Sequence, residues 1–229
     1  MFHQVILFIL ISISYGFQEC EKGAYVKTSF GAAVVEFQPV DLNMSMSAHA
    51  NILRNVKSLE YFIQEPSEVD ILVFPEYGLT STKIHTMTAK EFDHFAQEVP
   101  LHPFRPCVGH VSFWSILDHI SCLAYKYKIY LVINLVTRDR GQYFNTALAF
   151  NRKGQIVGEY HKYNIYDEPF ITKPSEAHVV TFDTDFGAKI GLMICFDINY
   201  ADPALSLVEQ VDAIAYPTAW TDELPFLTG

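Results

Sequence analysis

Three residues with catalytic chemistry each stand at the end of an apolar, strand-like segment. They are Glu76, Lys162 and Cys195. A cysteine inside a strand is usually a small buried hydrophobic residue, whereas one at the end of a strand can present its sulfur to a cleft. A thiol close to an acid–base group and a cation can attack a carbonyl carbon. These residue types therefore indicate covalent catalysis, with the cysteine as nucleophile.

The segments before the glutamate and the lysine have the pattern of strands. Residues 70–74 are a short apolar run that stops before Pro75, as expected of a buried strand. Residues 145–150 and 155–160 flank a polar turn that contains Gly154, which is typical of a hairpin. Both polar side chains are therefore expected at the ends of strands.

The surroundings of the cysteine predict a strand, a short turn and a helix. Residues 190–194 are apolar and lead directly into Cys195. Asp202 and Pro203 follow closely and form an N-cap and first-turn pair that starts a helix. Open α/β sheets gather their active-site groups at turns of this kind.

The rest of the chain alternates between the periods of strands and helices. The pattern predicts strands at 32–40, 130–136 and 211–216, helices at 52–63 and 114–128, and loop with short helix over 81–106. This alternation predicts an α/β fold.

The motifs around the three residues resemble those of the nitrilase (carbon–nitrogen hydrolase) superfamily, and most closely its vanin and biotinidase group. The strings that carry the resemblance are Phe74-Pro75-Glu76, Tyr160-His161-Lys162-Tyr163-Asn164, Gly191-Leu192-Met193-Ile194-Cys195-Phe196-Asp197-Ile198, Asp202-Pro203-Ala204 and Tyr216-Pro217-Thr218-Ala219-Trp220. The resemblance begins near Phe30 and runs to the last residue. Each string alone is a weak signal, but together and in this order they are specific.

The resemblance implies a four-layer α-β-β-α sandwich. Members of this family continue beyond the Pro-Thr-Ala-Trp string with more of the catalytic domain, and the vanin group adds a second domain. We therefore expect residues 17–229 to be a carbon–nitrogen hydrolase domain that is shortened at its C-terminus.

The resemblance also implies a role for each residue of the site. Glu76 would take the proton of the Cys195 thiol and give it to the leaving amine. Lys162 and the backbone N–H of Phe196 would stabilise the oxyanion, and a nearby lysine would also favour the thiolate. Nitrilase-type sites often hold a second acid soon after the lysine, and here Glu168, with Asp167 beside it, is the candidate.

The implied activity is the hydrolysis of a linear amide. Pantetheine, cleaved to pantothenate and cysteamine, is the first candidate substrate, and a biotin amide such as biocytin is the second. A catalytically silent binding module is the alternative from another class, but the intact set of three residues argues against it. A papain-like protease is excluded because no Cys-Gly-Ser-Cys-Trp string surrounds the cysteine.

The composition limits the classes of partner. The 229 residues are 50% hydrophobic and carry a formal net charge of −10, which fits a packed domain and argues against nucleic acid as partner. The nine histidines form no His-Glu-X-X-His spacing. We therefore expect a small-molecule amide substrate, no metal and no cofactor. Nothing in the sequence tells whether the protein forms oligomers.

The N-terminus has the pattern of a secretory signal peptide. Residues 5–11 are apolar and are followed by small residues up to Gly16, so we expect cleavage after residues 1–16 and a secreted protein. The apolar run is too short to cross a bilayer, and no integral membrane span is expected.

Secretion permits disulfide bonds and glycosylation. Cys122 lies off the apolar stripe of its helix, and Cys107 precedes that helix, so we expect a disulfide between these two. Cys195 then stays free, as a nucleophile must, and Cys20 has no assigned partner. Asn43 begins a glycosylation sequon in a polar stretch.

Overall fold

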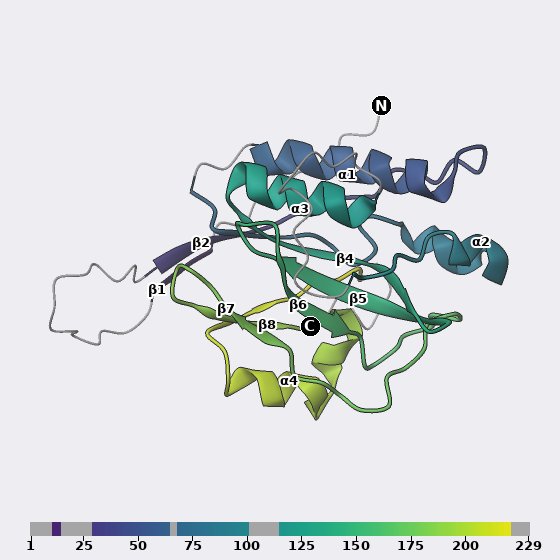
Figure 1. Ribbon diagram of the computed structural model, residues 1–229. Helices are drawn as coiled ribbons and strands as arrows, with labels where there is room; N and C mark the ends of the chain where they lie inside the picture. The colour runs from purple at the N-terminus through teal and green to yellow at the C-terminus, as the bar shows by residue number, and fades with distance from the viewer. Residues whose placement is uncertain (1–10, 15–28, 65–67, 101–114, 221–229) are drawn as a thin grey trace, which may run out of the picture.

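The protein is built from two β-sheets and the helices packed on them. The computed structural model describes residues 11–14, 29–64, 68–100 and 115–220 (Figure 1). The larger sheet has the strand order β1-β2-β3-β4-β5-β6, and the smaller has the order β7-β8-β9. The strands are β1 (Ile11–Ser14), β2 (Ser29–Val34), β3 (Ile71–Val73), β4 (Tyr130–Asp139), β5 (Gln142–Phe150), β6 (Ile156–His161), β7 (Thr181–Asp183), β8 (Lys189–Leu192) and β9 (Ala213–Ala215). The helices are α1 (Ala48–Gln64), α2 (Ala89–Asp93), α3 (Ile116–Tyr127), α4 (Ala201–Val208) and the 3₁₀ helices η1 (Thr82–Thr86) and η2 (Cys195–Asn199).

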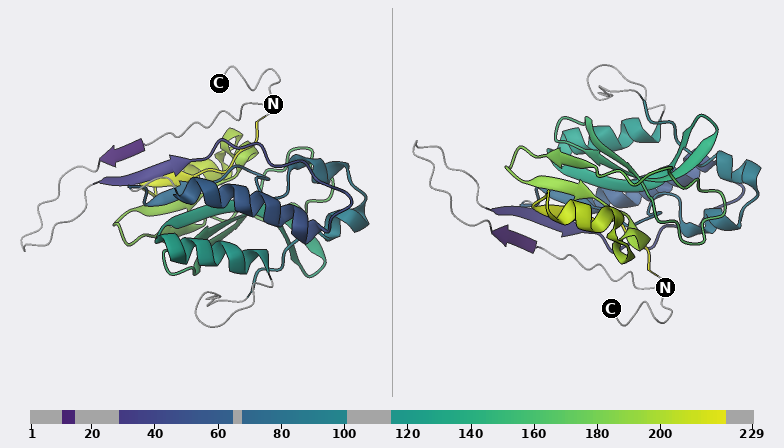
Figure 2. Two further views of the ribbon diagram at one scale, coloured as in Figure 1. Left: turned by 90° about the horizontal axis from the view of Figure 1, so that it is seen from above. Right: turned by 90° about the horizontal axis from the view of Figure 1, so that it is seen from below.

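Helices and sheets are stacked in four layers. Helices α1 and α3 cover one face of the larger sheet, and α4 lies beyond the smaller sheet (Figures 1 and 2). Leu72 and Leu131 belong to the core under α1 and α3, whereas Val132 and Ile190 belong to a second core between the two sheets. This α-β-β-α order confirms the predicted four-layer α/β sandwich.

The two large helices form where the apolar period predicts them. In α1 the side chains of Ile52, Val56, Leu59 and Ile63 are buried, as a single apolar face requires. Helix α3 begins at Ile116 rather than at 114 because residue 115 is a serine whose side chain caps the helix in a capping box with the residue at 118.

The centre of the larger sheet consists of β3 and β4. All residues of β3, and β4 from Tyr130 to Thr137, are buried because helices cover one face and the second sheet covers the other. β2, β3 and β4 run parallel, so the carboxyl end of β3 lies beside β4, with Val73 opposite Val132. β5 and β6 continue the sheet as antiparallel hairpins, which confirms the predicted hairpin.

The strand predicted at 32–40 is shifted toward the N-terminus in the structure. β2 spans Ser29–Val34, and one further ladder bond joins the Val35 N–H to the Val73 carbonyl. Its parallel partner β3 ends at Val73, and Pro75 has no N–H to extend the ladder. A strand cannot continue past the end of its partner, and this limit is not visible in the hydrophobic pattern of β2 itself.

The strand before Cys195 also ends earlier than predicted. β8 stops at Leu192, and Cys195 is the first residue of η2 rather than the last of a strand. Asp202 keeps an extended conformation inside α4, so the regular part of that helix begins at Pro203, as predicted. The strand predicted at 211–216 is present as β9, whereas the pattern did not predict β7.

Most of the predicted signal peptide, residues 1–16, lies outside the described residues. Within it, β1 pairs antiparallel with β2. In the part of the chain that the structure describes, no helix has the length and apolar character needed to cross a membrane. The cleavage site and the C-terminal shortening stay predictions, since residues 15–28 and 221–229 are not described either.

Candidate functional site

Glu76, Lys162 and Cys195 line one small cavity at the carboxyl ends of the strands. Glu76 follows β3, Lys162 follows β6, and Cys195 begins η2 after β8. The cavity has a volume of about 200 Å³. Its wall is formed by Glu76, Tyr77, Thr82, His85, Lys162, Tyr166, Asp167, Glu168, Cys195, Phe196, Ala219 and Trp220. The order of strands and turns thus brings together residues that are far apart in the chain.

The backbone holds Cys195 in a sharp turn. Its φ is +41°, in the left-handed region that residues other than glycine rarely adopt. The Cys195 N–H donates to the Pro217 carbonyl at 3.0 Å, and the Tyr216 hydroxyl donates to the Cys195 carbonyl at 2.5 Å. Strained backbone of this kind is concentrated at functional sites, where the surrounding contacts hold it in place.

The carboxylate of Glu76 is buried between the nucleophile and the lysine. Its Oε1 accepts hydrogen bonds from Lys162 Nζ at 2.7 Å and from Asn145 Nδ2 at 2.8 Å, and the Cys195 thiol also bonds to it. Burial raises the pKa of Glu76 above its usual range, although the ammonium of Lys162 opposes the shift. A carboxylate in this position can accept the thiol proton.

Lys162 is buried between two carboxylates. Its Nζ lies 2.7 Å from Glu76 Oε1 and 2.5 Å from Glu168 Oε1. Burial by itself lowers the pKa of Lys162, but the two negative charges outweigh it and leave the pKa above its usual range. The lysine is therefore a fixed positive charge in the wall of the cavity.

The predicted second acid is Glu168, and it lies with the other three residues. Its Oε2 accepts from the Tyr77 hydroxyl at 2.5 Å and from Asn145 Nδ2 at 2.9 Å. Its neighbour Asp167 also lines the cavity but has an exposed side chain. The geometry thus places Glu168 inside the cluster and Asp167 at its edge; their catalytic roles stay predictions.

The thiol of Cys195 is neutral at rest. Burial, followed by the negative charge of Glu76, raises the pKa of Cys195 to about 12, although the Ala219 N–H and the charge of Lys162 oppose the shift. Lys162 thus favours the thiolate, as expected, but burial and the charge of Glu76 outweigh its effect on the pKa. The thiol must lose its proton as it attacks, and Glu76 is the group in contact with it.

Two asparagines that the sequence analysis did not single out hold the glutamates in place. Asn145 donates to both Glu76 and Glu168, and it accepts a hydrogen bond from Asn134 Nδ2 at 2.6 Å. Asn134 in turn accepts from the Tyr77 N–H at 2.8 Å. The signal was present in the sequence, because Asn134 interrupts the apolar run of β4 and a buried amide needs partners.

A buried aspartate ties the cysteine turn to the lysine segment, and it was also missed. Asp197 accepts from the Ile194 N–H at 3.2 Å and from the Tyr160 hydroxyl at 2.8 Å. It also accepts from Asn164 twice, from the backbone N–H at 2.8 Å and from the side chain at 3.0 Å. The two catalytic candidates on either side are thereby fixed relative to each other.

The remaining predicted site residues have these positions. Phe196 follows the cysteine in the cavity wall, where a backbone N–H could meet an oxyanion, and this role stays a prediction. Asn43 is exposed, and its side chain accepts from Ser45. Cys122 is disulfide-bonded, but Cys107 and Cys20 lie outside the described residues, so the predicted pairing is not tested.

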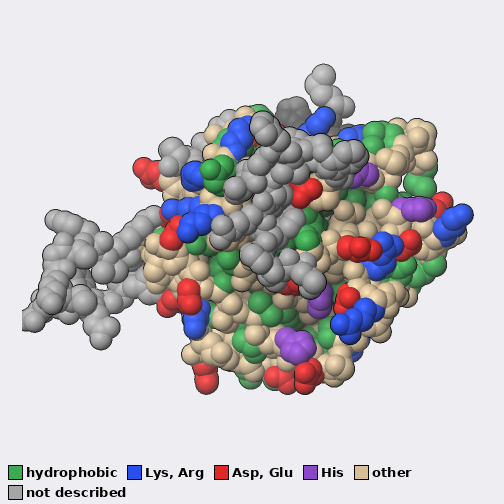
Figure 3. Space-filling model, in the orientation of Figure 1, with side chains coloured by type: hydrophobic (Ala, Val, Ile, Leu, Met, Phe, Trp, Pro, Cys, Tyr) green, Lys and Arg blue, Asp and Glu red, His purple; other side chains and the backbone are tan. Residues whose placement is uncertain are grey.

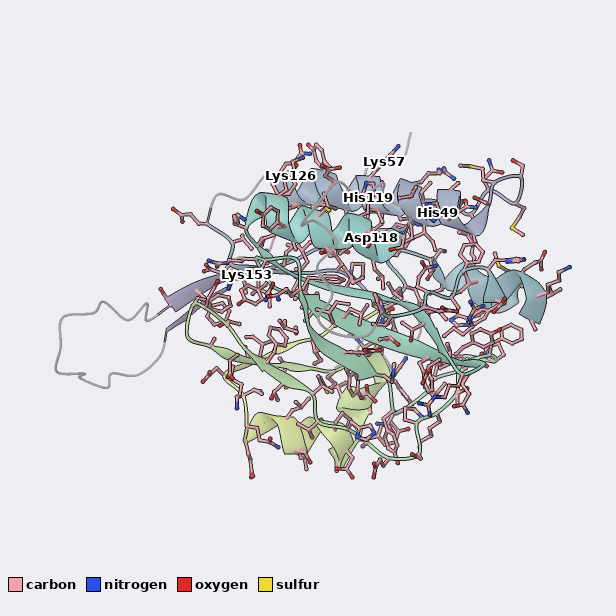
Figure 4. The ribbon with its side chains drawn as sticks, viewed as in Figure 1. His49, Lys57, Asp118, His119, Lys126 and Lys153 are labelled. Atoms are coloured by element: carbon pink, nitrogen blue, oxygen red, sulfur yellow. The ribbon has the colours of Figure 1, made fainter. Side chains whose placement is uncertain are left out.

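Among the lysines in the described part of the chain, Lys162 differs from the rest by its burial. Lys57 of α1, Lys126 of α3 and Lys153, in the turn between β5 and β6, have exposed side chains (Figure 4). None of the three lines the cavity. Among the described residues, no three histidine, cysteine or acidic side chains are grouped as a metal ion would require.

Comparisons with known proteins agree with the resemblance found in the motifs. The family model described as carbon-nitrogen hydrolase matches residues 31–223. Biotinidase of Rattus norvegicus is 33% identical over 86% of this chain and 41% of its own length. Pantetheinase of Bos taurus is 32% identical over 92% of this chain and 46% of its own length. The chain thus spans less than half the length of these two relatives.

A solved structure agrees as well. The carbon-nitrogen hydrolase from Helicobacter pylori superposes with a TM-score of 0.62 at 25% identity, over 82% of this chain and 59% of that protein. The matched motifs, the four-layer fold and the family model all point to the same conclusion, which is that the chain belongs to the carbon-nitrogen hydrolase family.

Proposed function

We propose that this chain hydrolyses a linear, non-peptide amide through a thioester on Cys195, and that pantetheine is the substrate. The observation that carries the proposal is the buried cluster of Glu76, Lys162 and Glu168 beside a free, buried thiol. Burying one ammonium with two carboxylates leaves one negative charge without a matching cation in the cluster, which is costly, and such groups with shifted pKa values are concentrated at catalytic sites. The similarity to pantetheinase supports the substrate, and the similarity to biotinidases supports biocytin as second candidate.

The first half of the reaction forms the acyl-enzyme. As the Cys195 sulfur attacks the amide carbon, Glu76 takes the thiol proton, and a tetrahedral intermediate forms. Lys162 and the backbone N–H of Phe196 stabilise its oxyanion. When the carbon–nitrogen bond breaks, Glu76 gives the proton to the nitrogen, so the amine leaves neutral and the acyl group remains as a thioester.

The second half returns the enzyme to its starting state. After the amine has left, a water molecule enters and Glu76 takes one of its protons while the oxygen attacks the thioester carbon. The carbon–sulfur bond then breaks, the sulfur is reprotonated by Glu76, and the carboxylic acid leaves. One amide and one water give one acid and one amine. We further propose that the protein acts outside the cell, since the N-terminal pattern is that of a signal peptide.

The test is amine release from pantetheine and from biocytin by the wild-type chain and its Cys195→Ala variant. We expect cysteamine release that is lost in the variant, and an acyl adduct on the wild-type protein after acid quenching, measured by intact mass. Lys162→Met should lose activity as well, whereas the matched change at an exposed lysine, Lys153→Met, should not. A folded wild-type chain that releases neither amine would contradict the proposal and favour a silent binding module.

A further inference from the structure

Thr218 carries a buried hydroxyl without a hydrogen-bond partner in the segment that holds the nucleophile. Its Oγ1 is inaccessible to solvent and forms no hydrogen bond of normal geometry with the part of the chain that the structure describes. A hydroxyl group that is buried without a hydrogen bond is costly, so its presence in a folded protein requires an explanation. The position of this hydroxyl next to Cys195 provides one.

The segment after β9 holds both the nucleophile and the base. The Pro217 carbonyl accepts from the Cys195 N–H at 3.0 Å, and the Tyr216 hydroxyl donates to the Cys195 carbonyl at 2.5 Å. The Thr218 carbonyl accepts from the Glu76 N–H at 3.3 Å. The backbone of Thr218 is thus fixed beside the two residues that carry out the first proton transfer.

The hydroxyl of Thr218 lies within reach of the Cys195 sulfur. Burial raises the pKa of the Cys195 thiol, and hydrogen bonds from the Ala219 N–H and from the Thr218 hydroxyl oppose the rise. Burial also raises the pKa of Tyr216, and the Thr218 hydroxyl again acts against the shift. At rest this hydroxyl is therefore close to two acceptors, the thiol sulfur and the phenol oxygen, and is well bonded to neither.

The charge of the sulfur decides which acceptor the hydroxyl prefers. A neutral thiol is a weak acceptor, whereas a thiolate is charged, and hydrogen bonds to charged groups are shorter and stronger. A hydroxyl hydrogen can rotate about its C–O bond, so Thr218 can turn it toward the sulfur when Glu76 removes the thiol proton. A donor that bonds more strongly during the attack than at rest lowers the barrier of the reaction.

The titratable groups that face the thiol do not replace such a donor. They include Glu76 and Tyr77 after β3, Lys162 after β6 and Tyr216 after β9. The negative charge of Glu76 disfavours a thiolate, and the ammonium of Lys162 is shared between two carboxylates. The hydroxyl of Thr218 is neutral and is bonded to neither carboxylate, so it is available to the sulfur.

We propose that Thr218 stabilises the thiolate of Cys195 during the attack by donating a hydrogen bond from its hydroxyl group to the sulfur. This inference rests on the proposed function and assigns a further residue to its first step. Glu76 takes the thiol proton in that step, and Thr218 keeps its own. Loss of the hydroxyl should therefore slow the attack of the sulfur on any carbon electrophile, whether or not it is an amide.

The experiment compares the wild type, Thr218→Val and Thr218→Ser by the rate at which iodoacetamide alkylates Cys195 at fixed pH, followed by mass spectrometry of the peptide that contains Cys195. Valine keeps the shape of threonine and removes the donor, whereas serine keeps the donor. We expect the alkylation rate and kcat/KM for amine release to fall about ten-fold in Thr218→Val and to recover in Thr218→Ser. The urea midpoint of Thr218→Val should not fall, since the lost hydroxyl has no partner at rest.

The control is the same change at Thr80, whose Oγ1 is also buried without a partner among the described residues but does not line the cavity. Thr80→Val should leave both rates unchanged. Unchanged rates in Thr218→Val would overturn the role of Thr218 while leaving the amidase intact. An equal loss in Thr218→Val and Thr218→Ser, with a lower urea midpoint, would overturn it in favour of a structural role. A wild type that is alkylated but releases no amine would instead overturn the proposed function, and the alkylation rates would still decide the role of Thr218.

Discussion

At the scale of single residues, the site buries more negative than positive charges. One ammonium, that of Lys162, is paired with the two carboxylates of Glu76 and Glu168, so the cluster keeps a net negative charge. Burial, and to a smaller extent the charge of Glu168, raises the pKa of Glu76. This makes Glu76 a stronger base than an exposed carboxylate, which suits a group that must deprotonate a thiol whose own pKa is raised.

The charge of Glu168 predicts a change in the pH profile. The base must be ionised, so kcat/KM falls as the pH drops through the pKa of Glu76. Glu168→Gln removes a like charge and leaves Lys162 paired with Glu76 alone, and both effects favour the ionised form. We expect the acid limb of kcat/KM to move to lower pH, as measured by amine release across the pH range.

The control for this prediction is a matched change far from the site. Glu176→Gln neutralises an exposed glutamate and should leave the acid limb where it is in the wild type. An acid limb that moves to higher pH in Glu168→Gln, or does not move, would mean that Glu76 is not the group that titrates in that limb.

At the scale of elements, the site depends on two turns whose positions relative to each other must stay fixed. η2 carries Cys195, and the segment after β6 carries Lys162. Asp197 joins them by accepting four hydrogen bonds, two from Asn164 and one each from Tyr160 and Ile194. Asp197 does not itself line the cavity, so it acts as a positioning residue.

Asp197→Asn should therefore destabilise the fold and misplace the nucleophile. An amide has one acceptor and one donor end, so at least one of the donors now facing Asp197 would meet an N–H₂ group. We expect a loss of about 2–4 kcal/mol in the free energy of unfolding and at least about ten-fold in kcat/KM. Urea unfolding measures the first, and amine release at a temperature where the variant is folded measures the second.

The same isosteric change at Asp183 serves as the control, since that side chain is exposed on β7. It should change neither stability nor rate. If Asp197→Asn unfolds at the same urea concentration as the wild type, the hydrogen bonds of Asp197 do not hold the two turns together.

The elements that could be predicted from the sequence are those whose pattern is local. The faces of α1 and α3 and the β5–β6 hairpin repeat with a period that is visible within one segment. The end of β2 could not be found in this way because its partner β3 sets it. The turn conformation of Cys195 depends on bonds to Tyr216 and Pro217, which are distant in the sequence.

The same distinction applies within the site. Glu76, Lys162 and Cys195 could be found because each stands in a recognisable string. Asn145 sits in an ordinary hairpin strand, and only the folded structure shows that its amide faces two glutamates. A sequence indicates such distant hydrogen-bond partners only indirectly. Asn134 is an example, because a polar residue inside an apolar strand must find a partner somewhere in the fold.

At the scale of the whole molecule, glycines allow the layers to approach closely. A Cβ at Gly158 of β6 would lie 3.0 Å from Leu192 Cδ1 of the second sheet. A Cβ at Gly191 of β8 would lie 2.7 Å from Leu207 Cδ2 of α4. Acidic and basic side chains are interspersed on the face seen in Figure 3, so no single-sign patch dominates that face. A side chain at either glycine would force the layers on its two sides apart.

The contact between Gly191 and Leu207 can be measured by a double-mutant cycle. Gly191→Ala should cost about 1–3 kcal/mol in the free energy of unfolding, because the added methyl group overpacks a fully buried leucine. Leu207→Ala should cost about 2–5 kcal/mol, since it leaves a cavity. In the double variant the new methyl group meets the space left by the leucine, so the combined loss should be smaller than the sum by about 1 kcal/mol. Urea unfolding of the four proteins gives this difference. Strict additivity would mean that α4 is not packed on the strand that leads to Cys195, and the fourth layer would then have no part in holding the nucleophile.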